Sequence, residues 1–200
     1  MALSGIPRVP LQTTTEQRHD IVSDDSEALI LVNSDDEEIG SLDKSACHDG
    51  DGVLHRAFSL FVFNADGELL LQRRSKDKRL WPGYWSNSCC SHPRVGETMA
   101  DAVQRRCQQE LGFTTQLEFV YKFEYSAQYE NEGTEHELCS VYVGQHTGAL
   151  DINASEIEDV QWMAPATLDN ELAENPKCYS PWLKLEWARL RADYPERLPI

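Results

Sequence analysis

Residues 91–112 read SHPRVGETMADAVQRRCQQELG. From Thr98 to Leu111 this stretch has no Pro or Gly, and its apolar residues recur at helical spacing, at Met99, Ala102, Val103, Cys107 and Leu111. Gly112 then supplies the left-handed residue that commonly ends a helix. The spacing therefore predicts an amphipathic helix over residues 98–111, the clearest helix in the chain.

Segments typical of strands lie on both sides of this helix. An Asp-Gly pair between two of them is a hairpin signal. The predicted strands are Ala28–Asn33, Ala57–Phe63, Glu68–Arg73, Leu117–Ala127, Glu137–Gln145 and Ile157–Trp162, and two helical segments follow, Leu168–Ala173 and Trp182–Tyr194. Because strands and helices do not alternate evenly, we predict an α/β fold with an α+β-like mixed sheet, antiparallel pairing and flanking helices.

Length and composition predict one domain with a short arm. The chain has 200 residues, of which 40% are hydrophobic and 26% charged, enough for one packed core. Residues 1–26 are polar and mostly without periodicity, which predicts a flexible N-terminal arm before a domain over residues 27–200.

The charge excludes several classes of protein. The chain carries 34 acidic and 18 basic residues, a net charge of −16, so it should repel nucleic acid and anionic membranes. No apolar run approaches the roughly 18 residues that a membrane span needs, and the first residues lack the apolar core of a secretory signal. Its six cysteines have no CxxC spacing and are expected to be free thiols. We expect a cytoplasmic protein, a monomer or weak dimer.

An acidic pair and three histidines could form a metal site. Glu135 and Glu137 would point to one face of a strand, where two carboxylates repel unless a cation lies between them or one is protonated. A solvated polar face is the alternative. His48, His55 and His92 could complete a set suited to zinc, manganese or magnesium, although a single histidine is more often merely exposed or packed in a core.

Basic residues gather in one short stretch. Five lie within residues 73–79: Arg73, Arg74, Lys76, Lys78 and Arg79. Such a run is usually a solvated edge, but in an acidic chain it is also a place, together with Arg105 and Arg106, where an anionic substrate could bind. Glu97 and Glu110 could carry Mg²⁺ to a bound phosphate.

Several motifs, in this order, resemble one enzyme family. They are Leu54–Ser59 (LHRAFS), Trp81–Gly83 (WPG), Asn87–Pro93 (NSCCSHP), Arg105–Cys107 (RRC), Glu135–Glu137 (EHE) and Ser180–Trp182 (SPW). From about Ala28 to about Leu190 the chain resembles the type I isopentenyl-diphosphate isomerases, enzymes of isoprenoid biosynthesis with a single Nudix-fold domain. The resemblance implies interconversion of isopentenyl and dimethylallyl diphosphate by a metal-dependent proton shift through a tertiary carbocation.

The resemblance also implies a role for each matching residue. Cys90 and Glu137 would face the two sides of the substrate double bond, with Tyr125 hydrogen-bonded near Glu137. The internal metal would be held by His48, His55, His92, Glu135 and Glu137, and a substrate-bound Mg²⁺ by Glu110. The small diphosphate substrate would be contacted by Lys44, Arg74, Lys78 and Arg106, and its hydrocarbon part by Trp182.

Two alternatives remain beside the isomerase. In the signature of Nudix pyrophosphohydrolases, aligned on Gly112, Ser91 stands at the first glycine, and Arg106 and Gln109 stand where glutamates are expected. One carboxylate, Glu110, hardly suffices to bind several metals and activate a water molecule. A non-catalytic metal- and phosphate-binding module is the other alternative, against which the presence of both Cys90 and Glu137 argues.

Overall fold

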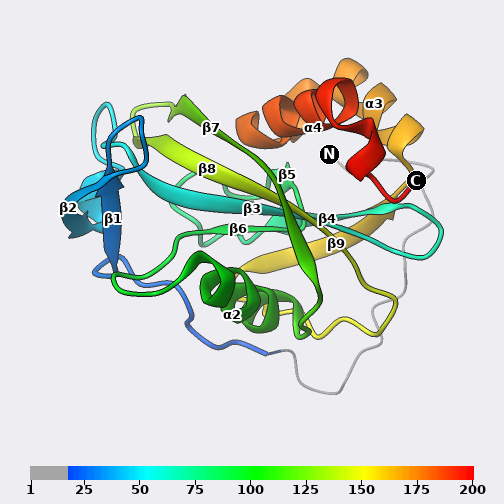
Figure 1. Ribbon diagram of the computed structural model, residues 1–200, viewed down its shortest axis with the longest axis horizontal. Coiled ribbons are helices and arrows are strands. Elements are labelled where there is room, and N and C mark those ends of the chain that lie inside the picture. Colours follow the sequence, from blue (N-terminus) through cyan, green and yellow to red (C-terminus); the bar gives the residue numbers. More distant parts are fainter. Residues whose placement is uncertain (1–17) are drawn as a thin grey trace.

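One mixed sheet forms the centre of the protein (Figure 1). The computed structural model describes residues 18–200, and within them the sheet has nine strands. The strands are β1 (Ala28–Val32), β2 (Glu38–Asp43), β3 (His55–Phe63), β4 (Leu69–Arg74), β5 (Trp85–Ser86), β6 (Cys89–Ser91), β7 (Leu117–Tyr129), β8 (Gly133–Gln145) and β9 (Ile157–Met163). β3 pairs with β8 in parallel, and the remaining pairs are antiparallel. The mixed sheet confirms the predicted fold class.

β3 has both of its faces buried, which explains its almost continuous apolar sequence. Phe61 and Phe63 pack with residues of the two C-terminal helices, whereas Phe58, Leu60 and Val62 pack with the long central helix on the other face. Because side chains alternate along a strand, the odd-numbered residues of β3 point to one core and the even-numbered residues to the other.

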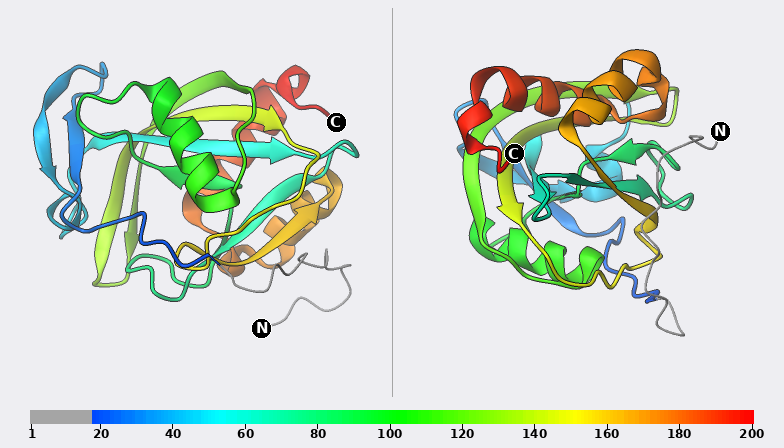
Figure 2. Two further views of the ribbon diagram at one scale, coloured as in Figure 1. Left: turned by 90° about the horizontal axis from the view of Figure 1, so that it is seen from below. Right: turned by 90° about the vertical axis from the view of Figure 1, so that its right-hand side faces the viewer.

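Helices cover both faces of the sheet (Figure 2). They are α1 (Lys44–Cys47), α2 (Met99–Leu111), α3 (Pro165–Glu174) and α4 (Pro181–Asp193), with 3₁₀ turns at Pro176–Cys178 and Pro195–Arg197. α2 lies on one face, and α3 and α4 lie together on the other. The predicted helix is confirmed: the Thr98 side chain accepts a hydrogen bond from the Asp101 backbone N–H, and Gly112 ends α2 at a φ of 81°.

The structure has short elements that the sequence did not predict, namely β2, α1, β5 and β6. β8 also begins earlier than predicted, at Gly133, so that Glu135 and Glu137 both lie inside the strand. The remaining predicted strands and helices lie within two or three residues of those found, with Leu168–Ala173 forming the second half of α3.

The predicted boundary at residue 27 differs from the structure, because residues 18–26 lie against the domain. Arg18 forms an isolated bridge with Asn153, and the Asp20 carbonyl accepts a hydrogen bond of 2.7 Å from Ser155 Oγ. The Val22 carbonyl accepts one of 2.6 Å from Arg106 Nη1. Polar backbone groups thus anchor a segment that lacks apolar periodicity. Residues 1–17 of the predicted arm lie outside the described residues.

In the part of the chain that the structure describes, no helix is both long enough and apolar enough to cross a membrane.

Candidate active site

A cavity of about 390 Å³ lies where β6, β7, β8 and the start of α4 meet the segments 21–25 and 74–80. It brings together most of the residues singled out from the sequence: Lys44, His48, Arg74, Lys78, Cys90, His92, Arg106, Tyr125, Glu135, Glu137 and Trp182. His55 and Glu110 are buried beside the cavity and do not line it.

Strand pairing places Cys90 and Glu137 on one face of the sheet. Cys90 of β6 is paired with Ser59 of β3, and Glu137 of β8 is paired with His55 of the same strand. Directly paired residues point to the same side of a sheet, and His55 and Ser59 are four residues apart, so all four side chains share one face. Cys90 and Glu137 therefore reach the cavity from opposite sides of β3.

The neighbouring thiol, Cys89, points away from the cavity. It is fully buried and packs with residues of α2, such as Val103 and Cys107, on the other face of the sheet. Cys90 is partly exposed and packs near Trp182 and Tyr125. The alternation along β6 thus leaves Cys90 as the thiol that lines the cavity.

The surroundings of Cys90 and Glu137 raise the pKa of both groups. Burial and the charge of Glu135 raise the pKa of Glu137, whose Oε2 accepts a hydrogen bond of 2.6 Å from the Tyr125 hydroxyl. Burial raises the pKa of Cys90 to about 12, and the positive charge of Arg74 offsets only part of this effect.

The three histidines and two glutamates do form a cluster. One ligand atom from each of His48, His55, His92, Glu135 and Glu137 lies within 4.8 Å of the others. The ligands come from four places: the residue after α1, the start of β3, the residue after β6, and β8. Residues far apart in the sequence thus converge because β3 lies between β6 and β8.

The hydrogen bonds of this cluster fit a divalent cation. The Nδ1 atoms of His48 and His55 lie 2.6 and 2.7 Å from the carbonyl oxygens of Lys44 and Val53. A carbonyl only accepts, so each Nδ1 carries a hydrogen, and Nε2 is the ring nitrogen left to bind a metal once it is unprotonated. Burial lowers the pKa of His55 to about 4 and also lowers that of His92, so both rings are neutral, the form that binds metals.

A bound cation would take the place of the proton that His48 holds opposite the Glu135 carboxylate. Glu135 Oε2 is buried and lies 2.8 Å from His48 Nε2, without hydrogen-bond geometry. Burial opposes a charge on His48, but the Glu135 carboxylate outweighs it and raises the His48 pKa to about 9. A divalent cation would satisfy this carboxylate in place of the proton, so metal binding should release a proton.

The cavity has a cationic end. Lys44, Arg74, Lys78 and Arg106 all line it. Lys44 Nζ donates to Ser23 Oγ, and Arg74 Nη2 donates to the Leu80 carbonyl at 2.9 Å. Burial lowers the pKa of Lys44, as does the charge of Lys78. Such a cluster of positive charges matches a small, multiply charged anion.

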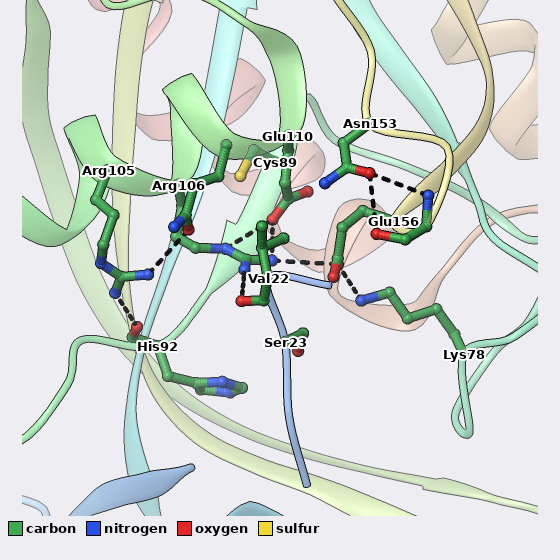
Figure 3. A network of polar contacts seen from close by, with 12 residues as sticks. Val22, Ser23, Lys78, Cys89, His92, Arg105, Arg106, Glu110, Asn153 and Glu156 are labelled. Atoms are coloured by element: carbon green, nitrogen blue, oxygen red, sulfur yellow. Dashed lines mark hydrogen bonds and ion pairs between the residues drawn. The ribbon is translucent and has the colours of Figure 1, made fainter. Parts of the chain in front are cut away.

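The remaining basic and acidic candidates have other partners. Arg73 and Lys76 point to Glu158, with N–O distances of 3.3 and 2.8 Å, outside the cavity. Glu97 is paired with Arg105 at 2.6 Å and does not line the cavity. Glu110 accepts a hydrogen bond of 2.9 Å from Arg106 Nε beneath the cationic end (Figure 3).

Aromatic residues form the apolar wall. The Trp182 indole N–H donates to Ser86 Oγ at 2.8 Å, which fixes the ring, and its ring centroid lies 5.2 Å from that of Trp81. The Arg74 guanidinium lies 5.1 Å from the Trp182 ring centroid. The indole N–H of Trp182 thus points into the protein interior, and its ring lines the cavity.

The sequence missed several lining residues: Ile21, Ser23, Asp25, Ser45, Asp77, Leu80, Ser91, Ser155 and Glu156. Arg79 was noted only as a member of the basic run. Ser23 was missed because its segment was taken for an arm. Glu156 is one of several acidic residues near the start of β9. In the sequence, only the basic run at residues 73–79 could have suggested that a carboxylate pairs with it.

These features define a class of protein. The family model of the NUDIX domain matches residues 53–183. Among solved structures, DR0079 from Deinococcus radiodurans has a TM-score of 0.68 at 24% identity, covering 82% of this chain and 98% of that chain. A MutT protein from Methanosarcina mazei Go1 has a TM-score of 0.58 at 16% identity, covering 69% and 93%. The chain is a member of the Nudix superfamily with a single Nudix fold.

Relatives with higher sequence identity show which family of the Nudix superfamily the chain belongs to. An isopentenyl-diphosphate Delta-isomerase from Escherichia coli strain SMS-3-5 is 42% identical over 169 residues, which cover 84% of this chain and 93% of the relative. An isopentenyl-diphosphate Delta-isomerase from Shigella sonnei has the same identity and coverage. The chain belongs to the isopentenyl-diphosphate Delta-isomerase family, type I, within the Nudix superfamily.

Proposed function

We propose that this protein is an enzyme that interconverts isopentenyl and dimethylallyl diphosphate. One observation supports the proposal above all: Cys90 and Glu137 reach one cavity from opposite sides of β3, and that cavity has a cationic end. The cations suit a diphosphate, and the two proton-bearing groups suit a double bond that must gain a proton at one end and lose one at the other.

The chemistry assigns different tasks to the two groups. Protonation of the terminal alkene carbon gives a tertiary carbocation, and loss of a proton from the neighbouring CH₂ gives the isomer. A thiol with a raised pKa is a poor acid, and its thiolate is a strong base. We therefore assign the donated proton to the Glu137 side and the removed proton to Cys90, acting as a thiolate once it has ionised; Arg74 offsets part of the burial that opposes this ionisation. Each forward turnover moves one proton from Glu137 to Cys90, and exchange with solvent then returns a proton to Glu137 and removes one from Cys90 before the next turnover.

Two further groups would assist. A divalent cation at the His48, His55, His92, Glu135 and Glu137 cluster (Mn²⁺, Zn²⁺ or Mg²⁺) would orient the Glu137 carboxyl and acidify its proton. The face of the Trp182 ring could stabilise the carbocation by about 2 kcal/mol in a desolvated site. Tyr125 holds Glu137 Oε2 by a hydrogen bond of 2.6 Å and so fixes its direction.

The diphosphate would bind at the cationic end through Lys44, Arg74, Lys78 and Arg106. The substrate would bring Mg²⁺, and Glu110 is the carboxylate proposed to bind it. Glu110 is paired with Arg106 in this structure, so it would exchange that partner for the substrate's Mg²⁺. We infer a cytoplasmic enzyme of isoprenoid biosynthesis, active as a monomer or weak dimer.

Pyrophosphate hydrolysis is the competing activity of the superfamily. On α2 the signature keeps Glu110, which is engaged by Arg106, while Arg106 and Gln109 occupy positions of the other carboxylates. A single engaged carboxylate gives little means to activate a water molecule. The observed arrangement therefore favours proton transfer over hydrolysis.

An assay in D₂O with Mg²⁺ and isopentenyl diphosphate tests the proposal. Dimethylallyl diphosphate carrying deuterium is the expected product. Phosphate release would instead identify a hydrolase, and unchanged substrate a binding module. Cys90→Ala and Glu137→Gln should each lose turnover by about 10³-fold or more, the scale of a removed acid or base. Cys89→Ala is the matched control because that thiol lies on the other face; equal loss there would contradict the assignment of Cys90.

A further inference from the structure

Glu156 is a buried carboxylate at the cationic end of the cavity. It precedes β9, is 4% exposed and lines the cavity. Its Oε2 accepts a hydrogen bond from Lys78 Nζ and lies 3.1 Å from Arg106 Nη2 (Figure 3). One carboxylate oxygen thus bridges two of the four cations proposed to bind the diphosphate.

The backbone fixes this carboxylate before any ligand binds. The Glu156 N–H donates to the Asn153 carbonyl at 3.1 Å, and the Glu156 carbonyl accepts from the Ser75 N–H at 2.9 Å. Asn153 is itself tied to α2, because its N–H donates to the Glu110 carbonyl at 2.9 Å. Glu156 is therefore held between the segment that carries Lys78 and the helix that carries Arg106.

Glu156 also separates positive charges that would otherwise repel one another. The charges of Lys78 and Arg106 outweigh burial and hold the pKa of Glu156 at about 2, so the group is ionised. Arg106 Nη2 is shared with Glu110 Oε1, to which Nε also donates at 2.9 Å, and Nη1 donates to the Val22 carbonyl at 2.6 Å. Glu156 is thus one of three groups that set the plane of this guanidinium.

We propose that Glu156 is a positioning residue for diphosphate recognition: it holds Lys78 and Arg106 at a fixed spacing that matches the anion. This inference rests on the proposed function, in which those two side chains contact the diphosphate. Glu156 is an anion at an anion-binding site, so its direct Coulomb effect on the ligand is unfavourable. Its benefit lies in orienting two flexible cations, whose side-chain freedom binding would otherwise have to remove.

The two effects predict opposite results for Glu156→Gln. If charge alone mattered, removing a negative charge would tighten diphosphate binding. If positioning matters, binding weakens. We expect the KM for isopentenyl diphosphate to rise about tenfold, equivalent to about 1.4 kcal/mol, with a much smaller change in kcat. The dissociation constant of Mg²⁺–pyrophosphate, measured by calorimetry, should rise by a similar factor.

Glu158→Gln is the matched control. Glu158 stands two residues further along the chain and also bridges two cations, Arg73 and Lys76, but it does not line the cavity. The substitution makes the same change in charge and should leave KM and pyrophosphate binding unaltered. Circular dichroism and thermal melting establish that each variant is folded.

A double-mutant cycle with Lys78→Met tests whether Glu156 affects pyrophosphate binding through Lys78. This test still applies if Glu156→Gln lowers the stability of the protein. If Glu156 acts through Lys78, its substitution should weaken pyrophosphate binding clearly less in the Lys78→Met protein than in the wild type. Unchanged or tighter pyrophosphate binding by Glu156→Gln, or equal effects of Glu156→Gln and Glu158→Gln, would overturn the inference. Absence of isomerisation by the wild type would instead contradict the proposed function, independently of the binding result.

Discussion

Glu186 shows how one buried residue can govern the response of the protein to pH. It lies on α4 one turn after Trp182, is fully buried, and its Oε1 accepts a hydrogen bond of 3.4 Å from the Cys139 thiol. Its Oε2 has no hydrogen-bond partner among residues 18–200. Burial therefore raises the pKa of Glu186 to about 8, and the carboxyl is neutral in the folded protein at pH 7.

This pKa makes folding stability fall as the pH rises. Below the ordinary pKa of 4.5, the group is protonated in both states and has no effect. Between pH 4.5 and about 8 the unfolded chain releases a proton that the folded protein keeps. The free energy of unfolding then falls by up to about 1.4 kcal/mol per pH unit from this group.

Glu186→Gln should remove this dependence, because the amide resembles the neutral acid and cannot ionise. We expect the variant to gain stability relative to wild type between pH 5 and pH 8, with the difference disappearing near pH 4. Urea unfolding at several pH values measures it. Glu174→Gln, an exposed position on α3, is the control and should leave the pH dependence unchanged. A wild-type slope retained in Glu186→Gln would contradict the assignment.

At this scale the sequence predicted part of the site. Cys90, His55, His92 and the two glutamates of the cluster could be named because they stand in the quoted motifs, and alternation along β6 then separates Cys90 from Cys89. Glu156 and Glu186 have no such motif. Their roles arise from partners far away in sequence, such as Arg106 and Cys139, which only the folded chain brings near.

The same distinction holds for whole elements. α2 could be predicted because its periodicity, its cap at Thr98 and its stop at Gly112 are local signals. β5 and β6 have two and three residues, and their strand character comes from pairing with β4 and β3. Pairing between distant segments leaves no periodic trace in so short a sequence.

The C-terminal end of α2 is attached to the loop that carries Glu156, at the cationic end of the cavity. After Gly112 the chain passes close to Asp151, whose N–H donates to the Leu111 carbonyl at 3.0 Å, and Asn153 follows with its bond to the Glu110 carbonyl. A Cβ at residue 112 would lie 2.4 Å from Asp151 Cβ and 2.7 Å from its carbonyl oxygen. Gly112 therefore allows the loop that carries Glu156 to dock on the helix.

Gly112→Ala should destabilise the protein and displace this loop. A positive φ costs an alanine about 1–2 kcal/mol, and the clash should add about 1–3 kcal/mol. Gly96→Ala is the matched control, because its φ of 79° is nearly the same as the 81° of Gly112 and nothing lies within 4 Å of its added Cβ. Urea unfolding should show a clearly larger loss for Gly112→Ala. Equal losses would mean that the close approach to Asp151 carries no cost.

At the scale of the whole molecule, the cluster of three histidines and two glutamates ties distant parts of the chain together. It joins the end of α1 and the start of β3 to β6 and β8, which lie on either side of β3. In a chain with a net charge of −16, two buried carboxylates at one point are a local concentration of negative charge. A divalent cation bound there should therefore stabilise the folded state as a whole, since the unfolded chain keeps no such site.

Removal of metal should accordingly lower the melting temperature, and Mn²⁺, Zn²⁺ or Mg²⁺ should restore it. A cation at 100 times its dissociation constant stabilises by about 2.7 kcal/mol, which corresponds to several degrees in a chain of this size. His48→Ala should abolish the response and the bound metal found by elemental analysis. His136→Ala is the control, because His136 stands between the two glutamates but its Nε2 lies 3.1 Å from Glu124 Oε1, away from the cluster. One equivalent of metal retained by His48→Ala, with an unchanged melting response, would place the cation elsewhere and remove the reason for these five side chains to converge.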